Sequence, residues 1–240
     1  MCFNIASNRN KKVLEARYQA EFVPVKFEPQ FSVSGFLYPG IPVISSDATK
    51  KIDLVQWGLI PSWVKSAQQA NELRPQTLNA RGETLFEKPS FRNSAGPRKC
   101  CILVNGFFEW QTQGKNKIPY FIFMKNQESF AFGGIWDEWK NPETNKVVRT
   151  FSIVTTEANP LMAEIHNAKK RMPLILQPGQ EQDWLNTLDE TGTKHLIRAI
   201  DENLLSAHPV SKLVNGRSGN PNVPEVQEAV QATPIQGSLF

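Results

Sequence analysis

The stretch CCILVNGFFEWQTQGKNKIPYFIFM, residues 100–124, decides the fold class, because it holds two runs typical of strands and a turn between them. Residues 102–104 and 120–124 are short runs of β-branched, aliphatic and aromatic side chains, as strands usually are. Residues 114–117 between them favour a hairpin loop. The stretch therefore predicts antiparallel strands.

Working outward, further apolar runs separated by turns continue this pattern at residues 52–60, 130–135, 150–155 and 174–176, with a second hairpin loop at 141–145. The helices expected are short: 11–22, 159–166, 181–188 and 193–200. Residues 24–42, with four prolines, are expected to be irregular. Many strands, few helices and no regular alternation of the two argue against a doubly wound parallel sheet. We expect an α+β domain, with a bent, largely antiparallel, barrel-like sheet and peripheral helices.

Length and composition favour one domain over residues 1–225, followed by a C-terminal tail at 226–240. The chain has 240 residues, 40% of them hydrophobic, which is ample for a core. There is no apolar run of ~18 residues and no basic region followed by an apolar one, so no membrane span or secretory signal is expected. We expect a protein inside the cell, in the cytoplasm or nucleoid of a bacterium. The net charge of +4 permits nucleic-acid binding without requiring it.

Three cysteines are present, and none forms a Cys-x-x-Cys pair, so neither a disulfide framework nor a zinc site is expected. Cys100 and Cys101 are neighbours and should lie on opposite faces of one strand, in the core and in a second layer. We expect no metal and no cofactor.

Cys2 follows the initiator Met1, and removal of Met1 would leave a thiol and a free α-amine on one residue. Ordinary pKa values of ~8.5 for the thiol and ~7.7–8.0 for the amine leave both groups reactive near neutral pH. The amine can form a Schiff base with an aldehyde, and the thiol can then close a thiazolidine ring. The alternative is a cysteine that packs as a small buried hydrophobe.

Four further segments combine polar with apolar residues, a pattern typical of buried chemistry. They are WGLIPSW at 57–63, NARGET at 79–84, GFFEW at 106–110, and Ile165-His166 followed by Arg171-Met172-Pro173.

With Cys2, these motifs resemble in kind and order the SRAP family, the SOS response-associated peptidases or abasic-site processing proteins, from Cys2 to about Val210. The resemblance implies one compact domain with a DNA-binding groove. It also implies that the mature N-terminal cysteine captures the aldehyde of an abasic site in single-stranded DNA as a thiazolidine, with accompanying lyase and autopeptidase activity. The expected partner is single-stranded DNA containing abasic sites, and we expect a monomer.

Glu109 lies between Phe108 and Trp110, and desolvation by these neighbours would raise the carboxyl pKa and suit it to proton transfer. The alternative is a surface glutamate between inward-facing aromatics. The resemblance assigns Glu109 to ring closure and to reversal of the crosslink. His166, with a near-neutral pKa, suits proton donation to the sugar ring oxygen, and the resemblance assigns it to sugar opening and strand cleavage. Otherwise it caps a helix end.

Asn79 and Arg81 are two residues apart and would project from one face of an extended segment. The resemblance implies that Asn79 contacts the reacting terminus and that Arg81 holds a phosphate, for which the guanidinium fork is suited. Alternatively, Asn79 ends a turn and Arg81 pairs with Glu83 or another surface acid.

The remaining DNA-binding candidates are spread over three segments. Trp63 could stack on bases, Lys169 and Lys170 with Arg171 could follow the phosphates, and His208 could support or contact the DNA. Two features depart from the family pattern. Many members begin Cys-Gly-Arg, where this chain has Phe3 and Asn4, and four residues rather than one separate His166 from Arg171. We expect these extra residues to bulge beside the site.

Two other classes of function remain open. An N-terminal-nucleophile amidohydrolase or peptidase would use the Cys2 amine as general base and Asn79 in an oxyanion hole. A non-catalytic single-strand binding module would need only Trp63, Arg81 and the lysines.

Overall fold

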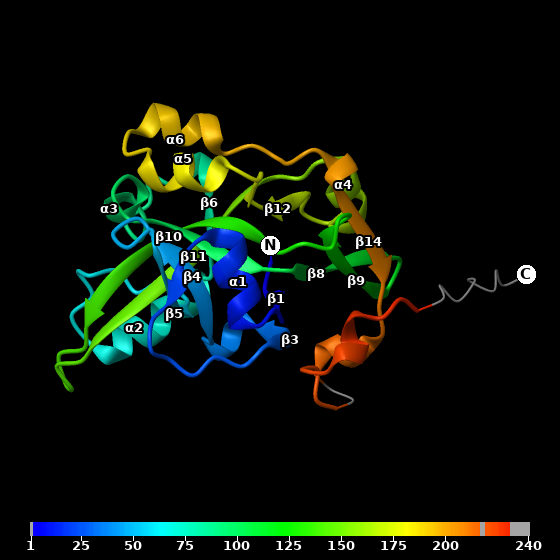
Figure 1. The fold of residues 1–240 in the computed structure, drawn as a ribbon, viewed down its shortest axis with the longest axis horizontal. Helices are drawn as coiled ribbons and strands as arrows, with labels where there is room; N and C mark the ends of the chain where they lie inside the picture. The colour runs from blue at the N-terminus through cyan, green and yellow to red at the C-terminus, as the bar shows by residue number, and fades with distance from the viewer. Residues whose placement is uncertain (1, 217–218, 231–240) are drawn as a thin grey trace, which may run out of the picture.

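A computed structural model describes residues 2–216 and 219–230 (Figure 1). The strands are β1 (Asn4–Ser7), β2 (Glu21–Phe22), β3 (Gln30–Ser34), β4 (Gly40–Ser45), β5 (Lys51–Trp57), β6 (Asn79–Arg81), β7 (Lys99–Val104), β8 (Gly106–Gln113), β9 (Asn116–Met124), β10 (Phe130–Lys140), β11 (Val147–Glu157), β12 (Arg171–Pro173), β13 (Ile175–Leu176) and β14 (Leu205–Pro209). The α-helices are α1 (Lys11–Tyr18), α2 (Ala67–Leu73), α3 (Arg92–Ala95), α4 (Pro160–Ile165), α5 (Gln180–Asn186) and α6 (Glu190–Leu196). The 3₁₀ helices are η1 (Gly35–Leu37), η2 (Arg74–Gln76), η3 (Gly82–Thr84), η4 (Glu202–Leu204), η5 (Lys212–Asn215) and η6 (Pro224–Gln227).

Five strands close into a barrel. β5, β4, β7, β10 and β11 pair in that order, all antiparallel, and a parallel pairing of β11 with β5 closes the ring at Thr150 and Gln56. β6 pairs in parallel with the later part of β11. The expected α+β class, with a bent, largely antiparallel, barrel-like sheet, is confirmed.

A second sheet, in the order β14-β9-β8-β1-β3, lies beside the barrel, to the right in Figure 1. Only Asn105 separates β8 from the barrel strand β7, so the two sheets are joined at that point. β1 pairs with β8, and the chain therefore begins next to the strand that carries the GFFEW motif.

Alternate side chains of the barrel strands enter two different clusters. Cys100 belongs to the cluster inside the barrel, and Cys101 to the cluster outside it, which the fully buried Trp184 of α5 and Leu14 of α1 cover. The predicted opposite placement of the two cysteines is confirmed. Full burial of such large apolar side chains contributes roughly 1.5–3 kcal/mol each, so the helices stabilise the barrel from outside.

Several predicted boundaries were wrong. The helix expected over 11–22 ends at Tyr18, because Gln19 adopts a left-handed conformation with φ 50°, and β2 follows. The strand expected to reach residue 60 ends at Trp57, because Gly58 has φ 97°. The helix expected over 193–200 spans Glu190–Leu196 instead.

The proline-rich stretch 24–42 was wrongly expected to be irregular. It contains β3 and the beginning of β4, and Pro42 pairs with Leu54 inside the barrel. Proline is normally read as a strand breaker because it lacks an N–H, and here the ladder accommodates it.

The tail boundary at residue 226 also differs from the structure. Val226 is fully buried, and the Val230 N–H donates to the Pro209 carbonyl at 3.0 Å. Residues 226–230 therefore pack on the domain, while 231–240 lie outside the described residues. Within the described chain, no helix has the length and apolar character needed to cross a bilayer.

Candidate active site around Cys2

Asn79 holds the N-terminal segment in place. Its Nδ2 donates to the Cys2 carbonyl oxygen at 2.8 Å, so Asn79 contacts the terminal residue as the resemblance implied. Asn79 pairs with Ile153 at the beginning of β6, and the preceding Leu78 carbonyl accepts a hydrogen bond from the buried Trp57 indole at 2.8 Å. Asn79 Oδ1 is buried and has no hydrogen-bond partner among the described residues, so the side chain keeps an unused acceptor.

The Cys2 side chain is fully buried. Burial, followed by the nearby Glu109 carboxylate, raises the pKa of the thiol well above its usual value. The expectation of an ordinary thiol pKa was therefore wrong, because apolar surroundings disfavour the thiolate. A neighbouring base has to remove the thiol proton as the sulfur reacts.

Glu109 lies on β8 and is only 3% exposed. Burial raises its pKa from 4.5 to about 7, the direction predicted from the sequence. The cause differs from the prediction: Phe108 and Trp110, as strand neighbours, point to the opposite face. Phe108 indeed packs in a separate cluster with Phe121. Glu109 is desolvated by what packs on its own face, where Cys2 and His166 lie.

His166 ends α4 and is buried beside Glu109. Its Nδ1 lies 2.7 Å from the Arg171 carbonyl oxygen, which can only accept, so Nδ1 carries the proton in the neutral ring. Nε2 then faces Glu109 Oε2 at 3.9 Å. Burial lowers the pKa of His166 below the near-neutral value expected. Because burial raises one pKa and lowers the other, the carboxyl and the imidazole compete for a single proton.

Asn159 begins α4 as predicted. Its Oδ1 accepts from the Met162 N–H at 2.9 Å, and Pro160 occupies the first helical position. This cap fixes the start of the short helix that delivers His166 to the site.

The residues after His166 form a turn beside the site, as expected. Asn167 exchanges two hydrogen bonds with the Thr112 backbone of β8, at 2.9 and 3.0 Å, and thereby ties the turn to the strand that carries Glu109. Lys169 and Lys170 are exposed on this turn. The charge of Lys169 opposes part of the effect of burial on the Glu109 pKa, so it lies near the carboxyl. Sequence reasoning missed Asn167, because nothing local marks an asparagine that clamps a distant strand.

Arg171 serves the architecture of the site. Its guanidinium forms a bidentate pair with Glu83, at 2.6 and 2.9 Å, and also donates to the Thr155 carbonyl at 2.9 Å. Phosphate binding by Arg171 remains a prediction, and both terminal nitrogens of its guanidinium already donate within the protein. The alternative in which Arg81 pairs with Glu83 is wrong, because both carboxylate oxygens of Glu83 accept hydrogen bonds from Arg171. The pair joins the NARGET and RMP motifs, so Glu83 is a positioning residue that the sequence did not single out.

Arg81 is exposed at the end of β6, opposite Thr155 of β11. Among residues 2–216 and 219–230, it has no side-chain hydrogen bond or ion pair. Arg81 therefore presents an open guanidinium. It lies at the same end of β11 as Arg171, because Arg171 pairs with Glu157 of that strand.

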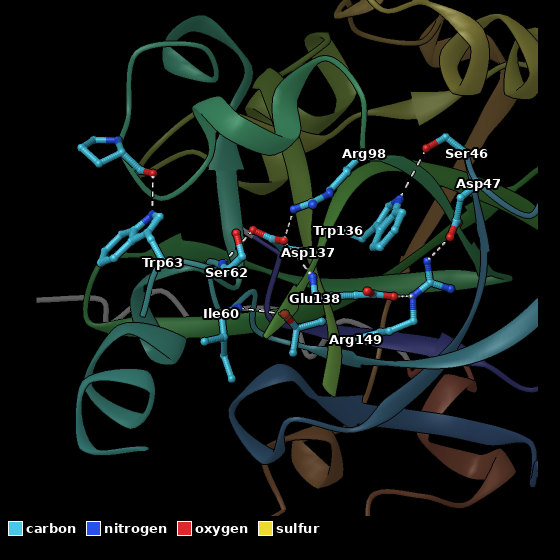
Figure 2. Close-up of polar contacts among 12 residues, drawn as sticks. Ser46, Asp47, Ile60, Ser62, Trp63, Arg98, Trp136, Asp137, Glu138 and Arg149 are labelled. Carbon is cyan, nitrogen blue, oxygen red and sulfur yellow. Dashed lines mark hydrogen bonds and ion pairs between the residues drawn. The ribbon is translucent and has the colours of Figure 1, made fainter. Parts of the chain in front are cut away.

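Trp63 lies apart from this group. Figure 2 shows its loop held against β10, where the Ser62 N–H donates to Asp137 at 2.9 Å. The Trp63 indole, 39% exposed, donates to the Pro89 carbonyl at 3.2 Å. Asp137 pairs with Thr150, near the beginning of β11, whereas Arg81 is near its end. DNA binding by Trp63 remains a prediction.

Figure 2 also shows charged and aromatic side chains that contact one another on this part of the barrel. Arg98 forms an ion pair with Asp137 and lies over the Trp136 ring, and Arg149 lies 4.0 Å from the same ring. Arg149 in turn pairs with Glu138. Both arginines are thus paired with carboxylates of β10.

His208 lies on the other face of the second sheet. It pairs with Phe121, which pairs with Phe108, so these three share the face opposite Glu109. Its Nε2 lies 2.8 Å from the Gln227 carbonyl oxygen. The structure therefore does not bring His208 to Cys2, and the contact it makes holds the C-terminal segment.

Four predicted residues thus meet at one place: Cys2, Asn79, Glu109 and His166. Fold and site together define a class, an α+β barrel protein whose candidate nucleophile is an N-terminal cysteine beside a buried carboxyl–imidazole pair. A family model described as SOS response associated peptidase (SRAP) matches residues 1–217, and the chain belongs to this family.

Curated relatives are named abasic site processing proteins. The abasic site processing protein YoqW of Bacillus subtilis is 37% identical over 192 residues, covering 79% of this chain and 81% of the relative. The abasic site processing protein HMCES of Pongo abelii is 32% identical over 210 residues, covering 74% of this chain and 57% of the relative.

A crystal structure of a protein from Bacteroides thetaiotaomicron has a similar fold, with a TM-score of 0.90 and 35% sequence identity. The similarity covers 96% of this chain and all of that one.

Proposed function

We propose that this protein processes abasic sites in single-stranded DNA by forming a covalent thiazolidine between mature Cys2 and the lesion aldehyde. The observation that carries the proposal is that Cys2 lies beside the Glu109–His166 pair. Asn79 holds Cys2 there through its carbonyl oxygen. The names of the curated relatives support the same activity.

The reaction balances with the loss of one water. The Cys2 α-amine adds to the aldehyde carbon, and the carbinolamine loses its hydroxyl as water to give an imine. The Cys2 sulfur then adds to the imine carbon, and its proton passes to the imine nitrogen, which closes the five-membered ring. In this proposal Asn79 Oδ1, which has no hydrogen-bond partner among the described residues, accepts an N–H of the reacting amine.

Glu109 is the proton carrier for these steps. With a pKa of about 7, it is present in both protonation states at neutral pH. The acid form protonates the departing hydroxyl, and the carboxylate accepts the proton of the buried thiol. Run backward, the same transfers release the DNA.

His166 acts on the sugar. An abasic deoxyribose is mostly a closed ring, and opening it to the aldehyde requires a proton on the ring oxygen. The neutral His166 has its Nε2 lone pair toward Glu109, so Glu109 supplies the proton that His166 delivers. The same imidazole serves as base in the lyase reaction that cleaves the strand.

Exposed cations beside the site hold the phosphates. Arg81 offers an open guanidinium, and Lys169 and Lys170 lie on the turn after His166. Each contact adds a charge-assisted hydrogen bond with no base preference.

An amidohydrolase using the same cysteine is less well supported. It requires Asn79 Nδ2 as an oxyanion donor, and one of the two N–H bonds of this group already donates to the Cys2 carbonyl. The peptidase activity in the family name corresponds, in this proposal, to removal of Met1, for which a methionine aminopeptidase also suffices.

The test is a denaturing gel. Met1-processed protein is incubated with single-stranded DNA carrying one abasic site, beside Cys2→Ala and an undamaged-DNA control. A shifted band that needs both Cys2 and the lesion is expected. No band from protein whose free Cys2 has been verified by mass spectrometry would refute covalent capture.

A further inference from the structure

A pocket of about 1110 Å³ lies at the edge of β9, in the part of the second sheet where β9 and β14 run side by side (Figure 1). It extends from the β8–β9 hairpin loop, residues 114–115, to residues 209–212, where β14 ends. Of the described residues, neither Cys2 nor Glu109 lines it. The volume exceeds the about 300–1,000 Å³ of a typical small-molecule site, so the pocket accommodates a larger ligand.

The backbone of β9 is unpaired where the pocket meets it. Thr112 of β8 pairs with Lys117 of β9, and the Thr112 N–H and C=O both bond to the Asn167 side chain, away from β9. The two residues of an antiparallel pair point their backbone groups either toward each other or both outward, so the N–H and C=O of Lys117 also point outward, away from β8. β14 covers β9 only from Tyr120 to Met124. Within the part of the chain that the structure describes, no hydrogen bond reaches these two Lys117 groups.

Pro119 shows where a further strand would lie. Its carbonyl points to the same side as the Lys117 groups, because backbone groups two residues apart on a strand share a direction. This carbonyl accepts a hydrogen bond from the Val210 N–H at 2.9 Å. Val210 directly follows β14, and the chain then turns into η5. An extended segment in the pocket would therefore take the place in the sheet that the chain leaves after Val210.

The pocket combines apolar side chains with lysines. Its apolar lining consists of Ile118, Pro119, Tyr120, Pro209, Val210 and Val230. Lys115, Lys117 and Lys212 are exposed around it, and none of them forms an ion pair with another described residue. The described lining contains no aspartate or glutamate. The pocket therefore favours a ligand that carries both apolar and acidic groups.

We propose that this pocket binds an extended acidic peptide segment of a partner protein, which adds a short strand beside β9. The peptide backbone bonds to the N–H and C=O of Lys117, and alternate apolar side chains fill the pocket. The carboxylates between them face the three lysines. The proposal goes beyond the proposed function and does not depend on it.

Two features favour a peptide over other occupants. A nucleic-acid strand would also be attracted by the lysines, but the backbone donor and acceptor of Lys117, side by side beside an apolar wall, match the repeat of an extended peptide. A second copy of this chain is disfavoured, because pairing this edge with itself would bring the lysines of the two copies together.

A peptide at this edge leaves the candidate active site open. The Asn167 side chain bonds to the opposite edge of β8, so β8 and β9 separate the peptide from the turn that follows His166. The partner can therefore hold the protein while Cys2 reacts, and docking here serves recruitment.

The test is fluorescence anisotropy with the full-length protein and a labelled seven-residue peptide in which aspartate alternates with valine and phenylalanine. One control peptide has asparagine in place of every aspartate. A second is N-methylated at its three central residues, so that it cannot donate hydrogen bonds along either edge. The acidic peptide should bind saturably, and each control should bind about tenfold more weakly.

Lys117→Glu keeps the backbone groups but replaces an attraction with a repulsion, so it should weaken binding of the acidic peptide about tenfold. Lys146→Glu is the matched control, because Lys146 is exposed beside the other hairpin loop, and it should bind as the unaltered protein does. Lys212→Glu should also weaken binding, and it provides a reading from a different segment if Lys117→Glu fails to fold.

Absence of saturable binding, or equal binding of the acidic peptide and either control, would overturn the proposal. Displacement of the peptide by an equal concentration of undamaged single-stranded DNA would assign the pocket to DNA instead. Binding that requires removal of residues 231–240 would assign it to this chain's own C-terminal segment.

Crosslinking to abasic DNA is measured with and without saturating peptide. It should be unchanged, and a loss of crosslinking on peptide binding would overturn the recruiting role. Absence of crosslinking in the free protein would refute only the proposed function, since peptide binding is measured separately.

Discussion

Replacing Glu109 with glutamine should stabilise the protein at alkaline pH while abolishing crosslinking. The carboxyl has a pKa of 4.5 in the unfolded chain and about 7 in the folded protein, because it is buried. Below pH 4.5 both states are protonated, and the burial has no electrostatic cost. Between pH 4.5 and 7 the folded protein binds more protons, so its stability falls as the pH rises.

The size of the effect follows from the two pKa values. Each unit corresponds to ~1.36 kcal/mol, so a carboxylate at position 109 costs the fold about 3 kcal/mol above pH 7. Most of this cost, roughly 2.5 kcal/mol, appears between pH 5 and pH 8. Glutamine has the same shape and no charge. Its stability relative to glutamate should therefore increase by that amount over this range.

Urea unfolding at pH 5 and pH 8, followed by tryptophan fluorescence, measures the change. With a typical dependence on urea, the midpoint of the glutamine variant should gain roughly 1 M on the parent between the two pH values. Glu157→Gln, at an exposed position of β11, is the control and should show no such gain. If the difference between Glu109→Gln and the parent does not change with pH, the carboxyl titrates normally and the role assigned to it is wrong.

The remaining predictions concern the frame of the site and its DNA contacts. Glu83→Gln removes the carboxylate of a bidentate, partly exposed pair with Arg171. We expect the free energy of unfolding, measured by thermal unfolding, to fall by about 1 kcal/mol and capture of abasic DNA to slow. Unchanged stability and rate would mean that Arg171 needs no partner. Asn167→Ala loses both hydrogen bonds to Thr112 and should slow capture of a closed-ring abasic site about tenfold. Capture of an oligonucleotide bearing an open-chain aldehyde should change little. Equal slowing of both would mean that Asn167 does not act on the ring opening assigned to His166. Arg81→Gln should weaken binding to all single strands and reduce the slope of log K against log salt by about 0.7, and an unaltered slope would show that Arg81 contacts no phosphate.

Local pattern was sufficient for the strand-rich class. The runs around residues 102–104, 120–124, 130–135 and 150–155 all became strands, because β-branched and aromatic side chains between turn residues favour extended chain wherever it packs. Asn159 and Pro160 fixed the start of α4 for a similarly local reason. Local pattern failed in the stretch 24–42, where the prolines hid β3 and the beginning of β4.

The sequence by itself determined the candidate nucleophile and the motifs that belong with it, since these depend on residue type and order. It did not determine that Glu83 pairs with Arg171 rather than Arg81, or that His208 lies on the far face from Glu109, because both depend on strand register between distant segments. The cause of the raised pKa of Glu109 was likewise decided by the tertiary structure. The pKa of Glu109 is raised by the groups that fold over its own face of the sheet. Its neighbours in sequence point to the other face and could not reveal these groups.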